Sequence, residues 1–148
     1  MPIRQATEAD VSRIAEIIVF NNRVNFFPIF RDEGYSFGEM QVVPLAGEYL
    51  ADRERLSHTW VYDDGVVKGL VTAMDGEVKK MYVDPAFQRQ GIGDALLTYA
   101  LREHHCTFVW TLEVNAGAIR FYRRHGFRLT GDKALEPVTD KSIVKLER

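Results

Sequence analysis

The sequence is poor in cysteine, in long apolar runs and in surplus charge of either sign. Its 148 residues include one cysteine, Cys106, so no intrachain disulfide, Cys/His metal cluster or CxxC redox pair can form. No apolar run approaches the roughly 18 residues that cross a bilayer, and the polar residues 1–10 resemble no export signal. These absences favour a cytoplasmic protein without a metal site.

The balance of charge excludes two classes of partner. Nineteen Lys and Arg residues against twenty-one Asp and Glu residues give a formal net charge of −2, which offers no electrostatic footprint for nucleic acid or an anionic membrane. A hydrophobic content of 46% is sufficient for a buried core. Because domains hold roughly 100–200 residues, the length predicts a single domain over residues 1–148.

Hydrophobic periodicity predicts a mixed α+β fold. Apolar residues three and four apart predict a helix over 11–20, with Thr7 as its N-cap and Asp10 three residues further on. Alternating residues joined by Asp-Gly turns predict a meander of strands over 59–62, 66–74 and 77–83. Further strands are expected over 3–6, 107–114, 127–129 and 142–146. Further helices are expected over 44–56, from Gln88 onward and over 116–125. A loop is expected over 21–43. These elements predict a mixed sheet with helices on both faces.

The turn after residues 77–83 is the most informative segment. Its sequence is Gln88-Arg89-Gln90-Gly91-Ile92-Gly93, between Pro85 and an amphipathic helix. Closely spaced glycines let backbone approach a ligand, and the N–H groups and dipole of a helix start attract phosphate. A tight turn that needs glycine only for its backbone angles is the alternative. A P-loop is excluded, because Asp94 follows Gly93 where that motif needs lysine.

These residues resemble the acetyl-CoA turn of the GNAT superfamily of N-acetyltransferases. Gln88, Gly91 and Gly93 match its pattern of Gln or Arg, two residues, Gly, one residue, Gly or Ala. A second stretch of this chain resembles the second signature of the family. It begins with Leu112–Asn115 and continues with Ala118-Ile119, Phe121-Tyr122 and Gly126-Phe127. The resemblance covers residues 77–129 and implies a GNAT-like acyl-CoA N-acyltransferase fold, with acetyl-CoA as cosubstrate.

The resemblance also implies where the cosubstrate binds. Backbone groups of residues 81–83 are expected to pair with the pantetheine arm as an added strand would, and the following turn is expected to hold the pyrophosphate. The expected cofactor-binding residues are Met81, Tyr82, Val83, Gln88, Arg89, Gln90, Gly91, Ile92, Gly93, Asp94, Asn115 and Ala118. Asp94 is a departure, because its carboxylate near the pyrophosphate must point away from it.

Acetyl transfer to an amine needs a base, an oxyanion stabiliser and a proton for the leaving thiolate. Glu77 is the candidate base, because of its position before the turn. A solvated charge at the end of a strand is an equally good interpretation of this residue. Glu113 is the second candidate base, and a chain of water molecules is the third route for the proton. Tyr122 is the candidate acid, since the family carries tyrosine there, and backbone N–H groups of residues 81–83 are expected to hold the oxyanion. Direct attack in a ternary complex is favoured, because Cys106 is expected to be a buried structural thiol.

The acceptor is left open by the sequence. The aromatic segment from Phe26 to Phe37 suggests an apolar or ring-bearing amine, although core packing is the favoured explanation for most of these rings. Arg23 or Arg31 is a candidate partner for a substrate carboxylate. Small-molecule and peptide amines both fit, and a homodimer is plausible. A noncatalytic acyl-CoA sensor or interaction module is the competing function, disfavoured because Glu77 and Tyr122 are both present.

Overall fold

The fold is built on one seven-stranded sheet, described by a computed structural model over residues 2–148. The strands are β1 (Ile3–Gln5), β2 (Thr59–Asp63), β3 (Val67–Met74), β4 (Glu77–Val83), β5 (Phe108–Leu112), β6 (Arg128–Leu135) and β7 (Ser142–Glu147). The helices are α1 (Val11–Asn21), α2 (Phe27–Phe30), α3 (Val42–Ala51), α4 (Arg53–Ser57), α5 (Ile92–Glu103) and α6 (Ala116–Arg124). Short helical turns are η1 (Glu8–Asp10), η2 (Asn22–Phe26), η3 (Gly34–Glu39) and η4 (Pro85–Phe87).

The strand order is β1-β2-β3-β4-β5-β7-β6. All neighbouring strands pair antiparallel except β4 and β5, which are parallel and are joined by the crossover helix α5. The Asp75-Gly76 turn joins β3 to β4, as its sequence predicts. The predicted fold class, a mixed and mostly antiparallel sheet, is therefore confirmed.

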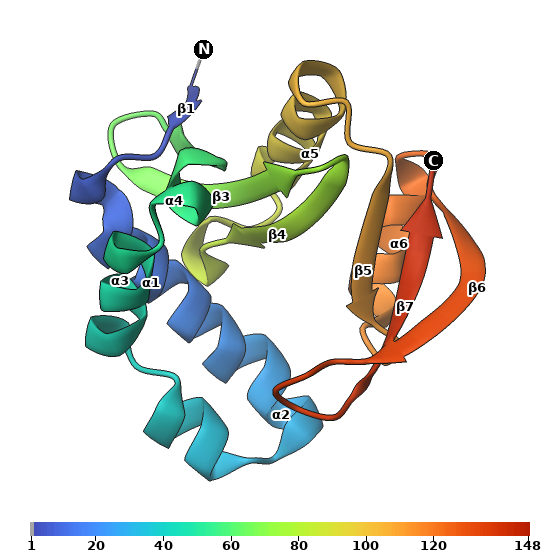
Figure 1. Cartoon of the computed structure of the whole chain (residues 1–148), viewed down its shortest axis with the longest axis horizontal. Coiled ribbons are helices and arrows are strands. Elements are labelled where there is room, and N and C mark those ends of the chain that lie inside the picture. Colours follow the sequence, from blue (N-terminus) through green and yellow to red (C-terminus); the bar gives the residue numbers. More distant parts are fainter. Residues whose placement is uncertain (1) are drawn as a thin grey trace.

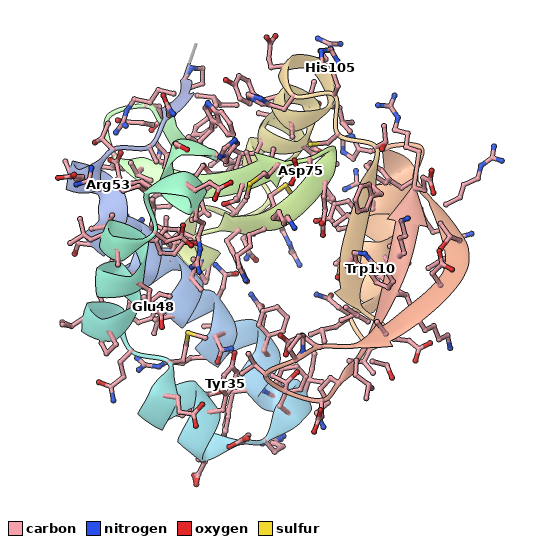
Figure 2. The ribbon with its side chains drawn as sticks, viewed as in Figure 1. Tyr35, Glu48, Arg53, Asp75, His105 and Trp110 are labelled. Atoms are coloured by element: carbon pink, nitrogen blue, oxygen red, sulfur yellow. The ribbon has the colours of Figure 1, made fainter. Side chains whose placement is uncertain are left out.

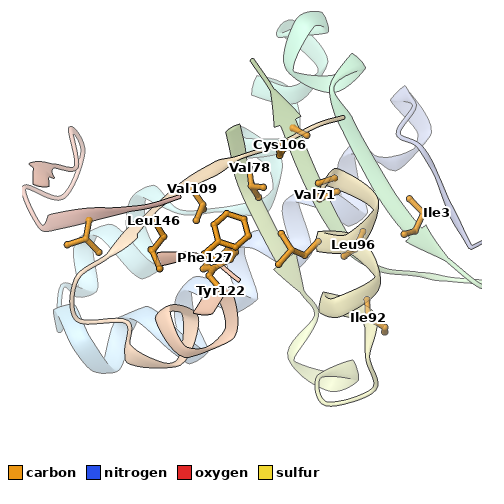
Figure 3. Close-up of a cluster of buried hydrophobic side chains, with 14 residues drawn as sticks. Ile3, Val71, Val78, Ile92, Leu96, Cys106, Val109, Tyr122, Phe127 and Leu146 are labelled. Carbon is orange, nitrogen blue, oxygen red and sulfur yellow. The ribbon is translucent and has the colours of Figure 1, made fainter. Parts of the chain in front are cut away.

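Helices cover both faces of the sheet (Figure 1). The apolar stripes of α1 and α3 pack with Val61 and Leu70 on one face. On the other face α5 and α6 pack against Val71, Val78 and Leu146, and Figure 3 shows this second cluster. Burial of these stripes explains why their residues recur at helical spacing.

The crossover helix α5 approaches β3 at Gly69. A Cβ atom there would lie 2.9 Å from the Tyr82 carbonyl oxygen and 3.0 Å from the Leu96 side chain. Only glycine fits between α5 and the neighbouring strand without displacing either. This contact fixes the position of the helix whose N-terminus begins at the glycine-rich turn.

The prediction of a loop over residues 21–43 is wrong. Most of this segment is helical, as α1 passes into the π-helical turn η2, then α2, then a second π-helical turn, η3. Pro28 does not interrupt it, because proline is tolerated in the first turn of a helix and here lies in the first turn of α2. Arg23 links the two ends of this segment, because it donates hydrogen bonds to the Ser36 and Met40 carbonyl oxygens at 3.2 and 3.3 Å.

Three boundaries also differ from the prediction. The helix expected over 44–56 is two helices, broken at Asp52, whose side chain accepts a hydrogen bond from the Arg55 N–H and so begins α4. The helix expected from Gln88 begins at Ile92, since Arg89 and Gly91 have φ of 64° and 81°. β6 extends to Leu135, beyond the predicted residue 129, as an exposed edge strand paired with β7. Among the described helices, none combines the length and apolar character needed to span a membrane.

Candidate functional site

The sheet opens between its two parallel strands. β4 and β5 pair only at Glu77 with Phe108 and at Val78 with Val109, although β4 continues to Val83 and β5 to Leu112. The ladder ends beside an irregularity in β4, where Ala73 pairs with Val78 but Thr72 pairs with Lys80. Beyond Val78 the two strands diverge and leave a wedge between them.

Backbone groups of β4 face this wedge. The Asp84 N–H donates to the Lys68 carbonyl of β3 at 2.8 Å, and Tyr82 pairs with Leu70 in the same register. Because successive residues of a strand point to opposite edges, the N–H groups of Met81 and Val83 point away from β3, toward β5. They are the backbone groups that sequence reasoning assigned to the pantetheine arm and the oxyanion.

A cavity of about 680 Å³ adjoins the wedge. Figure 2 shows Glu48 on α3 and Trp110 on β5 at opposite sides of it. The residues that line it are Ile18, Asn22, Phe26, Phe30, Tyr35, Glu39, Met40, Pro44, Leu45, Glu48, Tyr49, Arg55, Glu77, Lys79, Lys80, Tyr82, Trp110, Thr111, Leu112, Asn115, Glu136, Pro137, Val138, Thr139 and Ile143. Its walls are thus α1, η2, η3, α3, the diverging strands and the β6–β7 loop.

The two candidate bases lie in different settings. Glu77 lines the cavity, its side chain is 17% exposed, and Lys79 Nζ lies 3.1 Å from its carboxylate. Glu113 does not line the cavity, and its 41% exposed side chain pairs with Lys133 Nζ at 2.6 Å. The structure therefore brings Glu77, and not Glu113, to the cavity.

The glycine-rich turn forms the start of α5. Gly91 is the N-cap residue with φ of 81°, and open space surrounds the position of its missing Cβ. Gln88 Nε2 donates to the Val83 carbonyl oxygen at 3.3 Å, which ties the turn to the end of β4. Arg89 and Gln90 are exposed, whereas Ile92 is buried in the core and can offer a ligand only its backbone.

Asp94 in the first turn of α5 has a partner that the sequence did not suggest. Its Oδ1 lies 2.8 Å from Nε2 of His125, at the C-terminal end of α6. Neither Arg89 nor Arg124 pairs with it among the described residues. The hydrogen bond gives the Asp94 carboxylate a fixed position beside α6.

The second signature lies where β5 meets α6. Asn115 lines the cavity and also caps α6, since its Oδ1 accepts a hydrogen bond from the Ala118 N–H at 3.1 Å. Ala118 packs against the core and does not line the cavity. Gly93 approaches this helix, because a Cβ atom there would lie 3.4 Å from the Phe121 ring.

Tyr122 does not line the cavity and belongs to the core cluster beneath α5 and α6. Its ring packs edge-on against Phe127 in the core, as Figure 3 shows, and it is 7% exposed. Burial and the nearby Tyr82 phenol raise the pKa of Tyr122 well above its ordinary value. Tyr82 does line the cavity, and burial raises its pKa to about 12. Two phenols that hold their protons at neutral pH therefore lie near the wedge.

The aromatic segment contributes to the cavity more than to the core. Phe26, Phe30 and Tyr35 line the cavity, and no ring between residues 26 and 37 is fully buried. Arg23 is used in backbone hydrogen bonds, and Arg31 lies outside the cavity, so neither is placed to bind a substrate carboxylate there.

Cys106 and His104 both lie in apolar surroundings. Cys106 is buried, and burial raises the pKa of its thiol to about 11, which fits a structural thiol. His104 stacks on Trp60, with ring centroids 3.8 Å apart, and burial lowers its pKa. That shift opposes the charged form expected at a helix C-terminus. No group of three or more His, Cys, Asp or Glu residues within 2–148 is arranged to hold a metal ion.

Sequence reasoning missed Asn22, Tyr49 and Glu136 as cavity residues. Tyr49 lies in the predicted helix over 44–56, and the other two lie in segments without a motif. The only signal was the density of aromatic residues near Asn22, which does not distinguish a cavity from a core, and Glu136 has no aromatic residue near it in the sequence.

The sequence profile of the family described as "Acetyltransferase (GNAT) domain" matches residues 55–129. The peptidyl-lysine N-acetyltransferase YiaC of Escherichia coli (strain K12) is 34% identical over 90 residues, and this match covers 59% of the chain and 59% of YiaC. The chain thus spans well under two thirds of the length of that curated relative.

Solved structures agree on the fold. The PaiA N-acetyltransferase from Thermoplasma acidophilum in complex with coenzyme A has a TM-score of 0.70 at 16% identity, covering 99% of this chain and 98% of that one. The ribosomal-protein-alanine N-acetyltransferase from Brucella melitensis has a TM-score of 0.71 at 22% identity, covering 100% and 99%. With the family profile matched over half of the chain, these findings show that the protein belongs to the GNAT acetyltransferase family.

Proposed function

We propose that the protein transfers an acetyl group from acetyl-CoA to a primary amine by direct attack in a ternary complex. The wedge between β4 and β5 carries this proposal, because it presents free backbone groups beside both a helix N-terminus and a carboxylate. Membership of the GNAT family supports the same activity.

The described residues fit acetyl-CoA along this wedge. Met81 and Val83 offer their N–H groups to the pantetheine arm, as an added strand would. The Val83 carbonyl is already used, because it accepts hydrogen bonds from Asn21 and Gln88. The N–H groups at the start of α5, where Gly91 leaves open space, suit the pyrophosphate. Asn115, at the end of β5, faces the same cavity from the other side.

The reaction then follows from the groups at the wedge. Glu77 takes a proton from the bound ammonium, and the amine nitrogen attacks the thioester carbonyl carbon. A β4 backbone N–H, at Met81 or Val83, stabilises the oxyanion. The C–S bond breaks as the amide forms, and the departing thiolate takes a proton from Tyr122. The proton that the nitrogen loses on becoming an amide restores the Tyr122 phenol, whose raised pKa favours its protonated form.

The acceptor amine belongs to a small molecule or a peptide, and the relative YiaC is named for peptidyl lysine. A cytoplasmic location and a homodimer stay predictions from the sequence. The exposed edge strand β6 supports the second, since its unpaired backbone can join a second copy.

The test measures release of free CoA thiol from acetyl-CoA in the presence of amines, across pH, for the wild type and Glu77→Gln. Removing a general base lowers the rate by about 100- to 10,000-fold at neutral pH. The remaining rate should rise with pH as solvent deprotonates the amine, so the optimum moves upward. Glu113→Gln is the matched control and should keep the wild-type profile. An unaltered profile in Glu77→Gln would assign the proton to a water chain.

A further inference from the structure

Lys79 on β4 lies against the candidate base. Its Nζ is 3.1 Å from Oε1 of Glu77, and both residues line the cavity. The side chain of Glu77 is 17% exposed and that of Lys79 is 43% exposed, so the carboxylate is mostly covered while the ammonium is accessible to a ligand. The proposed reaction uses the carboxylate but gives no role to the amine beside it.

A bulge in β4 directs Lys79 toward the cavity. Val78 pairs with Ala73 of β3, and the next paired residue of β4 is Lys80, opposite Thr72. Lys79 is therefore the extra residue of the bulge. Bulges are common beside active sites, where they change the direction of a side chain. Lys79 and Lys80 consequently both line the cavity, although neighbouring residues of a regular strand point to opposite faces.

The position of Lys79 Nζ is the one that an acceptor nitrogen needs. A general base must lie within hydrogen-bonding distance, about 2.6–3.2 Å, of the atom whose proton it removes directly. The nitrogen of an acceptor that Glu77 deprotonates in this way would lie as close to its carboxylate as Lys79 Nζ does. The lysine ammonium is itself a primary amine on a flexible four-carbon chain. Lys79 therefore meets the geometric requirement of an acceptor.

The groups that would act on the thioester lie on the same stretch of strand. Met81, one of the two residues whose N–H is assigned to the oxyanion, follows Lys79 by two residues of β4, which is about 7 Å of extended chain. The flexible side chain of a lysine covers a comparable distance. The amine, the base and an oxyanion donor are thus all carried by residues 77–81, where β4 separates from β5.

The other lysines of the chain lack this arrangement. Lys68 and Lys133 pair with acids that do not line the cavity. Lys80 lines the cavity but forms no ion pair among residues 2–148. Lys141 and Lys145 have their ammonium groups over aromatic rings. Reaction with a bound thioester should therefore be concentrated at one lysine.

We propose that Lys79 is a site of self-acetylation, at which the protein transfers the acetyl group of bound acetyl-CoA to its own Lys79 Nζ. This inference rests on the proposed function, because it uses the same base, oxyanion donor and acid. Glu77 takes a proton from the Lys79 ammonium, and the nitrogen attacks the thioester carbonyl carbon. The N–C bond forms as the C–S bond breaks. Tyr122 gives a proton to the CoA thiolate, and the second proton that the nitrogen loses restores the phenol.

Self-acetylation changes the charge beside the base. The amide formed on Lys79 carries no positive charge, so the ion pair with Glu77 is lost. The amide nitrogen is also no longer a nucleophile. The reaction therefore consumes one acetyl-CoA per chain at this residue and then ends.

The test incubates the folded, unacetylated protein with acetyl-CoA and no added amine, and follows acetylation by intact mass and peptide mapping. Lys79 should be acetylated about 10-fold or more faster than any other lysine, as expected for an amine held beside its base. The rate per chain should not depend on protein concentration, because the transfer occurs within one molecule.

Three variants connect the label to the geometry. Lys79→Arg keeps a cation beside Glu77 but offers no nucleophilic amine at neutral pH, and it should lose this label. Lys80→Arg, at the neighbouring cavity residue, is the matched control and should be labelled at Lys79 at the wild-type rate. Glu77→Gln should lower the rate of labelling at Lys79 by about 100-fold or more, as loss of a general base does.

Uniform acetylation of all lysines, an unchanged rate in Glu77→Gln, or a rate that rises with protein concentration would overturn self-acetylation at Lys79. Calorimetric titration with acetyl-CoA and CoA release with added amines separate this inference from the function on which it rests. If acetyl-CoA binds and added amines are acetylated while Lys79 is not, the inference fails and the proposed function stands. If acetyl-CoA does not bind, both fail.

Discussion

Gly91 combines a backbone requirement with an expected ligand contact. Its φ of 81° is reached readily by glycine and, among other residues, most easily by asparagine and aspartate. The space around its missing Cβ is open, so a side chain there meets no protein atom within 4 Å. A substitution at this residue therefore tests the ligand and not the core.

Gly91→Asp should weaken acetyl-CoA binding far more than Gly91→Asn does. Both side chains adopt the left-handed conformation with similar strain, but only aspartate places a negative charge beside the pyrophosphate. A loss of about 10-fold or more in affinity relative to Gly91→Asn is expected from one unfavourable charge. Calorimetric Kd values for the two variants measure the difference, and equal values would remove the pyrophosphate from this turn.

Tyr122 and Tyr82 are two phenols with raised pKa values, and the proposed acid is the one that does not line the cavity. Tyr122→Phe should lower kcat by about 100-fold or more, as loss of a general acid does, while the KM for acetyl-CoA is kept. Tyr82→Phe should keep kcat within a few-fold. The reverse pattern would move the acid to Tyr82, and wild-type rates in both variants would assign the proton to water.

At the scale of a single element, the start of α1 depends on the ion pair between Arg4 and Asp10. Asp10 accepts hydrogen bonds from Arg4 at 2.8 and 2.9 Å and from the Thr7 N–H at 2.8 Å. The Arg4 guanidinium, opposed by burial and assisted by Thr7, holds the pKa of Asp10 below its usual value. α1 carries Asn22 at its end through η2, so this anchor also steadies one wall of the cavity.

A group with a lowered pKa stabilises the fold above its unfolded pKa and loses that contribution as the pH falls through its folded pKa. Asp10→Asn should therefore reduce the free energy of unfolding by roughly 1–2 kcal/mol at pH 7, allowing for the part-exposed Arg4. The gap between the wild type and the variant should narrow as the pH falls below the ordinary aspartate pKa of about 3.9, and close once the pH is below the lowered pKa of Asp10 in the folded protein. Urea unfolding across this pH range measures it, and a gap that persists in the most acid samples would show that the substitution disturbs packing instead of charge.

The elements that local signals define were predictable, and those that long-range contacts define were not. Alternation and Asp-Gly turns predict β2, β3 and β4 to within a residue or so. The segment 22–39 was missed because π-helical turns lack the 3.6-residue period, and Pro28 and Gly34 resemble loop residues. The break at Asp52 was missed because a capping side chain inside a helical pattern is indistinguishable from a solvated one.

The wedge is a property of the whole molecule. Its β4 side follows the meander, and its β5 side is held by β7, which pairs with β5 along its whole length. The sequence predicted Glu77, the turn at Gly91 and Asn115 through motifs, and the structure places Glu77 and Asn115 on the cavity and the turn at the start of α5. It could not predict that Asn22 and Tyr49 line the cavity, since the walls of a cavity are defined only when every neighbour is in place.

The central claim is that this wedge binds acetyl-CoA, and calorimetric titration of the purified protein with acetyl-CoA tests it most directly. NADH and ATP serve as comparison ligands, because they share the pyrophosphate or polyphosphate but lack the pantetheine arm that Met81 and Val83 are expected to bind. Binding of one acetyl-CoA per chain in the micromolar range, without comparable binding of NADH or ATP, is the predicted result. No binding of acetyl-CoA, or equal binding of all three, would contradict the account.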